Sequence, residues 1–384
     1  MSIKSNSHAL KSRKFFETTK SGDTFGEGAN VPFHGGDIYS ASENYGIPID
    51  QWLDLSTGIN PRSYNFNPID KQFFEQLPYV CPAFLKAASA YYQCSKLLPV
   101  AGSQAVIERL PSCLPQGNLW VPDVGYQEYS HQWLQQGRSL FSYPSLCRDK
   151  ATASISTAIR RGEIDHLLVI NPNNPTGLCF STEQLTQWAK ALEAGGGMLI
   201  VDEAFVDIKP ESSLLRNDRP LPDNVIVLRS FGKFFGLAGL RLGFVMANKA
   251  LLEGFAALFG PWAVNGIAQQ VAMQAFQDDA WQQDARDLIA KDQLFTQAIL
   301  QPLFIRFQMI QTPGLFSVYC LPAALAENIR EVFSQQGILL RIIPMTSEEC
   351  LVRVGNIRVG DAVGENTLAL AVEFAIEHLP LNIL

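Results

Sequence analysis

The chain has 384 residues, of which 47% are hydrophobic and 17% are charged, and its formal net charge is −7. This composition excludes a disordered chain, and the length predicts one large and one small domain. An acidic chain without a basic stripe is not expected to bind nucleic acid or an anionic membrane surface. No run of 18 apolar residues is present and the polar N-terminus lacks a signal-peptide core, so we expect a cytoplasmic protein.

Four segments are predicted along the chain. Residues 1–28 are polar and mildly basic and are expected to form a flexible extension. Residues 29–75 show no clear periodicity and are expected to pack against the small domain. Residues 76–264 are expected to form a large α/β domain, and residues 265–384 a connecting helix and the small domain. The seven cysteines include no CxxC pair, so we expect reduced thiols and no metal site.

Short apolar runs in the middle of the chain indicate strands that are buried on both faces. These runs are residues 167–170, 198–201, 225–228 and 242–247. Between the first two, the stretch from Ser181 to Ala194 predicts a helix, with Ser181 as its cap and Gln184 as the capping partner. The alternation of strand and helix predicts an α/β fold with a mostly parallel sheet, in which ligands lie at the carboxyl ends of the strands.

The C-terminal third reads as a smaller α+β domain. The predicted elements are a helical stretch over 266–300, a strand over 315–320, a helix over 327–335 closed by Gly337, strands over 338–343 and 351–354, and a final helix over 365–378.

A single lysine, Lys233, stands in an apolar, glycine-rich loop after a predicted strand. Apolar surroundings disfavour an ammonium group and lower its pKa, as a Schiff-base lysine requires. Ser230 and Arg241 flank the lysine and are suited to holding a phosphate beside it. A lone lysine is more often a solvated side chain. The serine, the glycines and the arginine around this one favour a catalytic role instead.

Four further motifs carry polar or aromatic groups. Asp202 directly follows a buried strand and needs a cationic partner, such as a protonated pyridine nitrogen, or else caps a helix. The sequence NPNNPTG over 171–177 is a rigid turn in which one of the two X-Pro bonds can adopt the cis form. Residues 101–105 read as a helix start whose N–H groups suit a phosphate. Tyr126 is either a core residue or a ring that stacks on a cofactor.

The order and spacing of these motifs resemble those of the fold-type-I pyridoxal-phosphate enzymes, the aminotransferase family. Asp202 lies 28 residues after Asn174, Lys233 lies 31 residues after Asp202, and Arg241 lies eight residues after Lys233. The resemblance runs from about residue 33 over nearly the whole chain. It implies an aminotransferase-like fold with a large cofactor-binding domain over 76–264, pyridoxal 5′-phosphate as cofactor, and a homodimer whose sites form between two subunits.

The resemblance also implies a role for each residue of the set. Lys233 would carry the cofactor covalently, and Asp202 would keep the pyridine nitrogen protonated, which makes the ring an electron sink. Asn174 would bond the 3-oxygen of the ring, and Tyr126 would stack on it. The residues that bind the cofactor phosphate would be Gly102, Ser103, Gln104, Ser230 and Arg241.

The N-terminal motifs HGGD over 34–37 and DLSTGINP over 54–61 resemble the opening of the threonine-phosphate decarboxylases of cobalamin biosynthesis. By that likeness, His34 and Gly35 would bind the phosphate of the substrate. Arg353 would face its carboxylate, a role that suits the planar guanidinium fork. Arg341 would be a second arginine for an anionic substrate. The substrate-binding set is therefore His34, Gly35, Gly58, Asn174, Arg341 and Arg353.

Three positions depart from the pattern of the relatives. Phe205 stands where many aminotransferases have tyrosine, which removes a hydroxyl from the ring oxygen. Gly58 stands where some decarboxylases have asparagine. The tyrosine that the partner subunit contributes in relatives has no clear counterpart, and Leu77 or Tyr79 occupies that region.

The function expected from the resemblance is decarboxylation of L-threonine O-3-phosphate to (R)-1-amino-2-propanol O-2-phosphate. The alternative is an aminotransferase acting on histidinol phosphate or a related amino acid, since both share every cofactor residue. A dinucleotide-dependent oxidoreductase is disfavoured because no GxGxxG follows an early strand. A catalytically silent binding protein is disfavoured by the intact set of Lys233, Asp202, Asn174 and Arg241.

Overall fold

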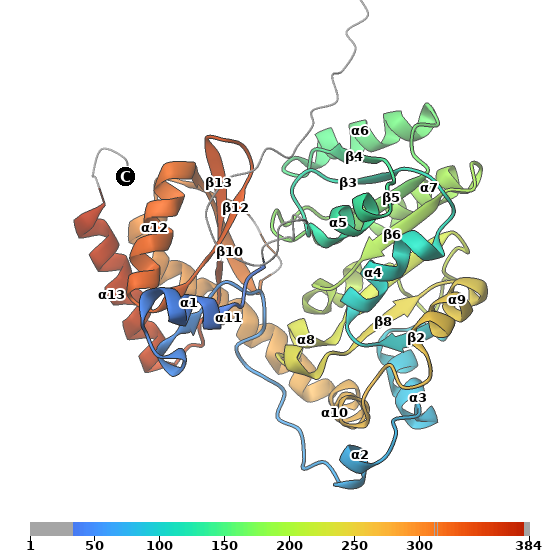
Figure 1. Ribbon diagram of the computed structural model, residues 1–384, viewed down its shortest axis with the longest axis horizontal. Helices are drawn as coiled ribbons and strands as arrows, with labels where there is room; N and C mark the ends of the chain where they lie inside the picture. The colour runs from blue at the N-terminus through green and yellow to red at the C-terminus, as the bar shows by residue number, and fades with distance from the viewer. Residues whose placement is uncertain (1–33, 311, 313, 380–384) are drawn as a thin grey trace, which may run out of the picture. The chain divides into compact units, whose positions relative to one another are not determined.

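The structure is a computed structural model, and it describes residues 34–310, 312 and 314–379 (Figure 1). The extension predicted over residues 1–28 lies outside the described residues. Two β-sheets of different size organise the described chain, and a short two-stranded pairing joins the N-terminal segment to the C-terminal third. No helix of the described ranges combines the length and apolar character needed to cross a membrane. All seven cysteines lie in these ranges and are free thiols.

The larger sheet has seven strands in the order β2-β8-β7-β6-β5-β3-β4. Only β8 runs against its neighbours, so the prediction of a mostly parallel sheet is confirmed. The strands are β2 (Leu97–Val100), β3 (Leu119–Pro122), β4 (Leu140–Tyr143), β5 (His166–Ile170), β6 (Met198–Asp202), β7 (Val225–Ser230) and β8 (Gly243–Met246).

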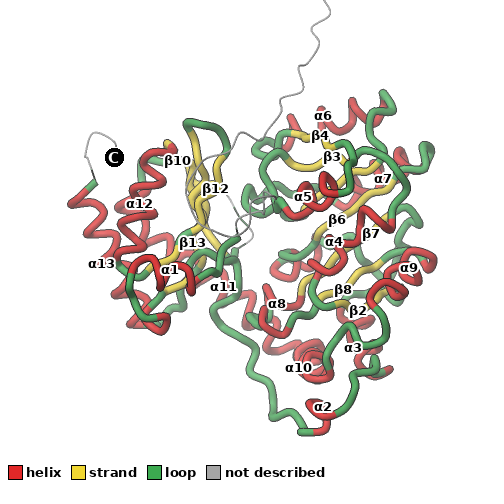
Figure 2. The backbone as a smooth tube through the Cα atoms, viewed as in Figure 1, coloured by secondary structure: helices red, strands yellow, loops and turns green. Residues whose placement is uncertain are grey.

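Both faces of this sheet are covered by helices, as the uniformly apolar strands predict (Figure 2). Successive side chains of a strand point to opposite faces, and Val169 and Val201 belong to one buried cluster while Leu168 and Ile200 belong to another. The helices are α3 (Pro82–Tyr91), α4 (Ser103–Cys113), α5 (Glu128–Gln135), α6 (Arg148–Arg160), α7 (Thr182–Glu193), α8 (Phe231–Phe234), α9 (Lys249–Phe259) and α10 (Gly266–Gln277).

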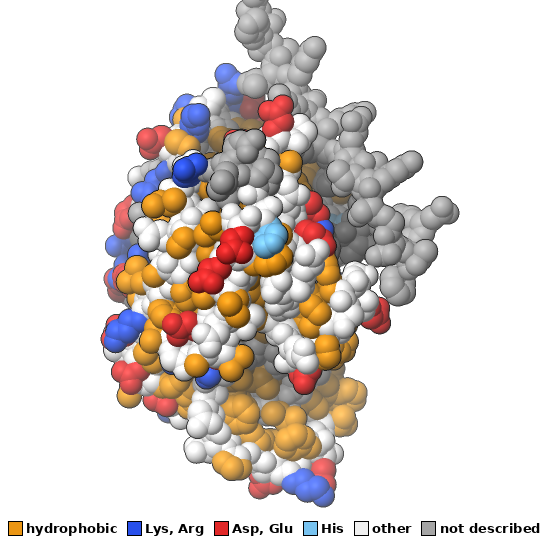
Figure 3. Space-filling model, turned by 90° about the vertical axis from the view of Figure 1, so that its left-hand side faces the viewer, with side chains coloured by type: hydrophobic (Ala, Val, Ile, Leu, Met, Phe, Trp, Pro, Cys, Tyr) orange, Lys and Arg blue, Asp and Glu red, His pale blue; other side chains and the backbone are white. Residues whose placement is uncertain are grey.

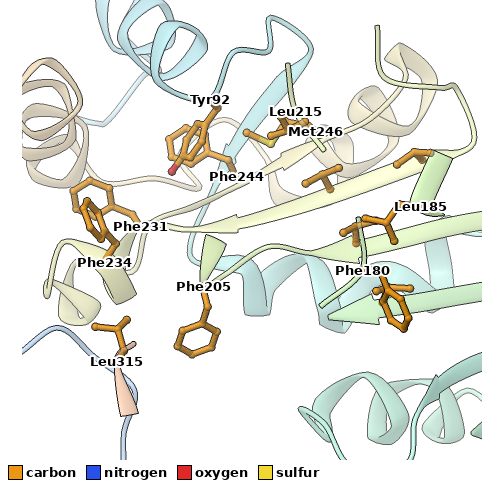
Figure 4. Packing of buried hydrophobic residues seen from close by; sticks show 14 of the residues in the cluster. Tyr92, Phe180, Leu185, Phe205, Leu215, Phe231, Phe234, Phe244, Met246 and Leu315 are labelled. Carbon is orange, nitrogen blue, oxygen red and sulfur yellow. The ribbon is translucent and has the colours of Figure 1, made fainter. Parts of the chain in front are cut away.

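Aromatic side chains dominate the cluster that lies beside α8. Figure 4 shows Tyr92 and Phe244 next to each other, and their ring centroids are 4.9 Å apart. Phe231 and Phe234 of α8 are buried in the same cluster. Large buried rings contribute strongly to stability, so the short α8 is anchored by packing rather than by its length.

The smaller sheet is antiparallel, with the order β12-β13-β10-β9. Its strands are β9 (Gln308–Ile310), β10 (Phe316–Pro322), β12 (Arg341–Pro344) and β13 (Glu349–Gly355). A separate cluster of buried residues joins this sheet to its helices. These helices are α11 (Asp279–Phe304), α12 (Ala323–Gln335) and α13 (Ala362–His378).

The N-terminal segment is tied to this region by parallel pairing of β1 (Leu53–Asp54) with β11 (Ile338–Leu339). It also contains α1 (Ile38–Tyr45), which the sequence analysis missed, and α2 (Gln72–Glu75). The α1 helix begins at a side-chain cap, because Asp37 accepts a hydrogen bond from the backbone N–H of Ser40. A helix of eight residues is too short to show a strong period in the sequence.

Most predicted elements are confirmed, two of them are each divided in the structure, and the helices predicted to begin at residues 327 and 365 begin earlier, at Ala323 and Ala362. The helix predicted from Ser181 is α7, in which the Ser181 hydroxyl accepts from the N–H of Gln184. The stretch 266–300 is two helices, because Asp278 caps a new helix by accepting from the N–H of Trp281. The strand predicted over 338–343 is split, since β11 pairs with β1 and β12 pairs with β13.

Candidate active site

Two adjoining cavities contain all the predicted site residues. The first has a volume of about 130 Å³ and the second about 190 Å³. Tyr126, Asn174, Phe205 and Lys233 line both. The remaining predicted residues of the first cavity are Gly102, Ser103, Gln104, Asp202, Ser230 and Arg241. Those of the second are His34, Gly35, Gly58, Arg341 and Arg353.

The first cavity lies at the carboxyl ends of the parallel strands. Asp202 is the last residue of β6 and Ser230 the last residue of β7, while Asn174 follows β5 in a turn with cis bonds before Pro172 and Pro175. Parallel strands end at one edge of the sheet, so residues far apart in the chain meet there. The α8 helix begins directly after β7 and brings Lys233 to the same edge.

Lys233 is a buried amine with a lowered pKa. Burial lowers the pKa of its ammonium most, the positive charges of Arg353 and Arg241 lower it further, and Asp202 partly opposes them, so that the pKa is about 8. An amine with this pKa is neutral in about a tenth of the molecules at pH 7, far more than an ordinary lysine. It is therefore available as a nucleophile and as a proton carrier.

Asp202 is a buried carboxylate with two hydrogen-bond donors. The hydroxyl of Tyr129 donates to it at 2.7 Å and the N–H of Ala204 at 3.0 Å. Burial raises the pKa of Asp202, while these two bonds and the charge of Lys233 oppose the rise. The residue ends a strand and does not cap a helix, which removes the alternative that the sequence left open.

The start of α4 forms a cradle for an anion. Its cap residue, Gly102, has a positive φ of 79° and provides no side chain, so the first N–H groups of the helix have no capping side chain. A Cβ at Gly102 would lie 2.7 Å from the Arg241 guanidinium, and a Cβ at Gly243 would lie 2.6 Å from the backbone nitrogen of Ser103. Helix N–H groups beside a guanidinium favour a phosphate group.

Tyr126 and Asn174 lie where the two cavities meet. The hydroxyl of Tyr126 donates to the side-chain oxygen of Gln104 at 3.0 Å. Burial first, and then the charges of Glu128 and Asp202, raise the pKa of Tyr126, so its hydroxyl stays protonated. The side-chain oxygen of Asn174 accepts a hydrogen bond from Arg353 at 2.8 Å.

Two arginines line the second cavity, and they lie side by side on one face of two paired strands. Arg341 in β12 and Arg353 in β13 are direct partners in the antiparallel register. Burial lowers the pKa of each guanidinium to about 10, and the charge of Arg341 contributes to the shift at Arg353. Arg353 also donates to the carbonyl oxygen of Ser56, whereas its Nε has no hydrogen-bond partner among the described residues.

The HGG motif is hydrogen-bonded to the second N-terminal motif, DLSTGINP. The N–H of Gly36 donates to the Ser56 hydroxyl at 2.7 Å, and that hydroxyl donates to Asp54 at 2.6 Å. A Cβ at Gly35 would overlap the carbonyl oxygen of Ser56, so no side chain fits there. The imidazole of His34 lies 2.6 Å from the Glu128 carboxylate. The two motifs therefore form one wall of the second cavity.

The structure explains the glycine at position 58, one of the departures from the relatives. A Cβ at Gly58 would lie 2.7 Å from the ring of Phe316 and 3.1 Å from the ring of Phe205. These two buried rings are in an edge-to-face arrangement with centroids 5.5 Å apart. An asparagine has no room at position 58 while both rings are present. Leu77 and Tyr79 are exposed in this chain and line neither cavity.

Three contributing residues were missed in the sequence analysis. Glu128 binds His34, Tyr129 donates to Asp202, and Ser56 joins Gly36 to Arg353. Glu128 stands at the first position of a helix, where an acidic residue is common for electrostatic reasons alone. Ser56 stands within the motif over 54–61, to which no individual role was assigned, whereas no pattern in the sequence separates Glu128 and Tyr129 from ordinary helix residues.

The first cavity fits pyridoxal phosphate. It offers a buried amine with a lowered pKa, a buried carboxylate, an aromatic ring and an anion cradle at one edge of the sheet. These groups match an aldehyde, a protonated pyridine nitrogen, a ring face and a phosphate respectively. The fold and the cavity together define an enzyme of fold type I that uses pyridoxal phosphate.

Comparison with known proteins places the chain more closely. The family model described as aminotransferase class I and II matches residues 69–373. The threonine-phosphate decarboxylase of Pseudomonas aeruginosa is 43% identical over 246 residues, which cover 64% of this chain and 71% of that protein. That of a Sinorhizobium species is 38% identical over 252 residues, covering 64% and 72% respectively. The chain belongs to the class I and II aminotransferase family, and pyridoxal phosphate is its cofactor.

Solved structures share the fold. The histidinol-phosphate aminotransferase of Sinorhizobium meliloti, in complex with pyridoxal 5′-phosphate, aligns with a TM-score of 0.72 and 18% identity over 91% of this chain and 96% of that chain. The L-threonine-O-3-phosphate decarboxylase of Porphyromonas gingivalis aligns with a TM-score of 0.65 and 18% identity over 84% and 99% respectively. The prediction of an aminotransferase-like fold is therefore confirmed.

Proposed function

We propose that this enzyme decarboxylates L-threonine O-3-phosphate to (R)-1-amino-2-propanol O-2-phosphate and acts in cobalamin biosynthesis. The observation that carries the proposal is the pair of arginines, Arg341 and Arg353, in the cavity that adjoins Lys233. The proposed substrate carries a carboxylate and a phosphate, and two guanidinium groups suit these two anionic groups, with Arg353 facing the carboxylate. The relatives named threonine-phosphate decarboxylase support this choice of substrate.

The groups of the first cavity have distinct tasks in this proposal. When bound, pyridoxal phosphate withdraws electrons from the Cα of the amino acid joined to it. The Asp202 carboxylate holds a proton on the ring nitrogen, and the Tyr129 hydroxyl keeps that carboxylate oriented. The start of α4, with Ser230 and Arg241, binds the cofactor phosphate. Lys233 would hold the aldehyde of the cofactor and would supply the proton that takes the place of carbon dioxide at Cα.

Substrate anchors decide which bond at Cα breaks. A decarboxylase must present the bond from Cα to the carboxylate to the cofactor, so that carbon dioxide would leave and a proton would take its place at Cα. Arg341, Arg353 and His34 surround the cavity beside Lys233 and orient the substrate from its anionic end. Fixed orientation is worth several kcal/mol of the barrier, about 7 or more in favourable cases.

The competing candidate is an aminotransferase that acts on histidinol phosphate. It is favoured by the same arginine pair, because histidinol phosphate also carries a phosphate monoester. Such an enzyme removes a proton from Cα and leaves the carbon chain intact. The two candidates therefore differ in product and share the cofactor groups.

We also propose a homodimer. Exposed apolar residues gather on and beside α2, where Phe74, Leu77 and Tyr79 have exposed fractions of 62%, 63% and 69%. Figure 3 shows hydrophobic side chains at the lower end of the face it draws, the end at which Figure 1 places α2. Exposed apolar patches of this kind are typical of protein–protein contacts.

The function is tested by incubating the cofactor-loaded enzyme with L-threonine O-3-phosphate, with and without 2-oxoglutarate. Carbon dioxide and glutamate are measured together. We expect carbon dioxide at an equal rate in both samples and no glutamate. Glutamate without carbon dioxide contradicts the proposal and supports a transaminase, for which histidinol phosphate is the next substrate.

A further inference from the structure

Glu128 is a buried carboxylate whose hydrogen bonds reach residues of both cavities. It stands at the first position of α5, with an exposed fraction of 6%. Burial pushes the pKa of its carboxyl up, but hydrogen bonds from His34, Gln104 and Gln132 outweigh this and hold the pKa below its usual value. Burying a carboxylate costs desolvation free energy, which is offset only where neighbouring groups donate hydrogen bonds to its charge.

One oxygen of Glu128 holds the wall of the second cavity. It lies 2.6 Å from Nε2 of His34, although 94 residues separate the two in the chain. His34 is half exposed, and its ring centroid lies 5.6 Å from that of Tyr126. Among the described residues, this contact is the only hydrogen bond between the imidazole and the large domain, so it fixes how the HGG motif meets the cavity.

The other oxygen of Glu128 reaches the first cavity through Gln104. The side-chain nitrogen of Gln104 donates to it at 3.0 Å, and the side-chain oxygen of Gln104 accepts from the Tyr126 hydroxyl at 3.0 Å. Because Glu128 takes the amide nitrogen, Gln104 is held with its oxygen toward Tyr126. A single carboxylate thus orders groups in both cavities.

We propose that Glu128 is a positioning residue that couples the two cavities. Through Gln104 it sets the orientation of Tyr126 in the cofactor cavity, and through His34 it sets the wall at which the substrate phosphate binds. The second branch rests on the proposed function, whereas the first depends only on the cofactor. Glu108 provides an internal comparison, since it also accepts from Gln104, at 3.4 Å, but it is exposed and does not contact His34.

The experiment compares E128A, E128Q and the matched control E108A. Three quantities are measured on each: the Kd for pyridoxal phosphate, hydrogen exchange at the Gly36 amide in the cofactor-loaded enzyme, and the KM and kcat for L-threonine O-3-phosphate. The melting temperature of each cofactor-loaded variant is recorded beside them. The first two quantities need no substrate and therefore test the coupling even if the proposed substrate is wrong.

We expect E128A to raise the Kd for pyridoxal phosphate and the KM by about tenfold each, the loss that follows when hydrogen bonds to a charged group are removed. Exchange at the Gly36 amide should also become faster, because His34 is released. E128Q retains an acceptor for Gln104 and loses the charge that faces His34, so its Kd for the cofactor should return to the wild-type value while its KM stays raised. Adding H34A to E128Q should raise KM no further, because both changes break one contact.

Several outcomes overturn the proposal. An E128A enzyme with unchanged cofactor Kd and unchanged exchange at Gly36 shows that Glu128 couples nothing. Equal effects in E108A show that a general loss of charge is responsible. If E128A does not fold, the proposal is tested on E128Q alone. Wild-type values of both Kd and KM in E128Q would show that Glu128 does not act separately through Gln104 and through His34. A wild-type enzyme that binds its cofactor but does not turn over L-threonine O-3-phosphate contradicts the proposed function alone.

Discussion

The two cavities are built in different ways from the same chain. The first takes its groups from the ends of neighbouring parallel strands, where β5, β6 and β7 stop. The second combines the N-terminal motifs with two strands of the smaller sheet, so that Gly35 and Arg353 line one space. The first is therefore set by the sheet, and the second by pairings between segments that are far apart in the sequence.

Because the two cavities are built differently, we expect the first to supply the chemistry and the second to select the substrate. Groups at the edge of the large sheet are held by uniformly buried strands, which favours the fixed geometry that a cofactor needs. The second cavity rests on specific contacts such as Gly36 with Ser56 and Arg353 with Asn174. Changes in these contacts alter what binds without altering the sheet. Variants in the two cavities should therefore have different signatures.

The largest effect is expected for Lys233 in the first cavity. K233A removes the amine that we propose to carry the cofactor and to move the proton, so turnover should fall by roughly 10²–10⁴-fold or more. The visible absorbance of the lysine-bound cofactor should disappear as well. K249A is the matched control, because the Lys249 side chain is 86% exposed in α9. Retention of the absorbance band in K233A would assign the covalent link to another amine.

A smaller effect is expected in the second cavity, where a variant should weaken substrate binding and leave the cofactor in place. Arg353 spans Asn174 and the Ser56 carbonyl, and a lysine cannot reproduce this fork. R353K should raise the KM by about 10–100-fold, the range for lost hydrogen bonds to a charged group. The cofactor absorbance should remain. R358K is the control, since Arg358 is exposed five residues further along the chain. Loss of the cofactor in R353K would show that the cavities are not separable.

The same difference between the cavities explains which parts of the site could be predicted from the sequence. Lys233, Asp202 and Asn174 lie in local motifs that directly follow apolar strands, so their meeting could be predicted from strand order. The facing of Arg341 and Arg353 depends on the register of a β-pairing, which only the structure shows. Glu128 and Tyr129 could not be predicted, because each acts through a contact to a residue more than 70 positions away.

The pH dependence of cofactor uptake sharpens the description of the first cavity. In the cofactor-free enzyme the pKa of Lys233 is about 8 instead of 10.5. Only the neutral amine attacks an aldehyde, so the rate of cofactor uptake should rise about tenfold per pH unit below pH 8 and level off above it. D202N removes the charge that raises this pKa and should shift the midpoint to lower pH. A midpoint near 10.5 would contradict a desolvated lysine.

The same pKa difference affects the stability of the cofactor-free enzyme. The native pKa of Lys233 lies below that of the unfolded chain, so the unfolded chain binds more protons between about pH 8 and 10.5. Lys233 therefore makes the free energy of unfolding increase as pH rises through this window. K233M should remove this increase, which denaturant titrations at pH 7.5 and 10 would measure. An identical slope in K233M would assign the effect to other groups.

The smallest effect on catalysis is expected at Gly58, where the two regions touch through packing. A Cβ there would lie 2.7 Å from Phe316, so G58A should lower the free energy of unfolding by about 1–3 kcal/mol and leave the cofactor absorbance unchanged at low temperature. F316L makes room for the methyl group, and the double variant G58A/F316L should be more stable than the sum of the single changes predicts. G254A is the control of opposite sign, because Gly254 is exposed in α9 and its Cβ would meet nothing within 4 Å. Additive effects of G58A and F316L would show that the backbone at position 58 moves away, and that the glycine is not required by the two rings.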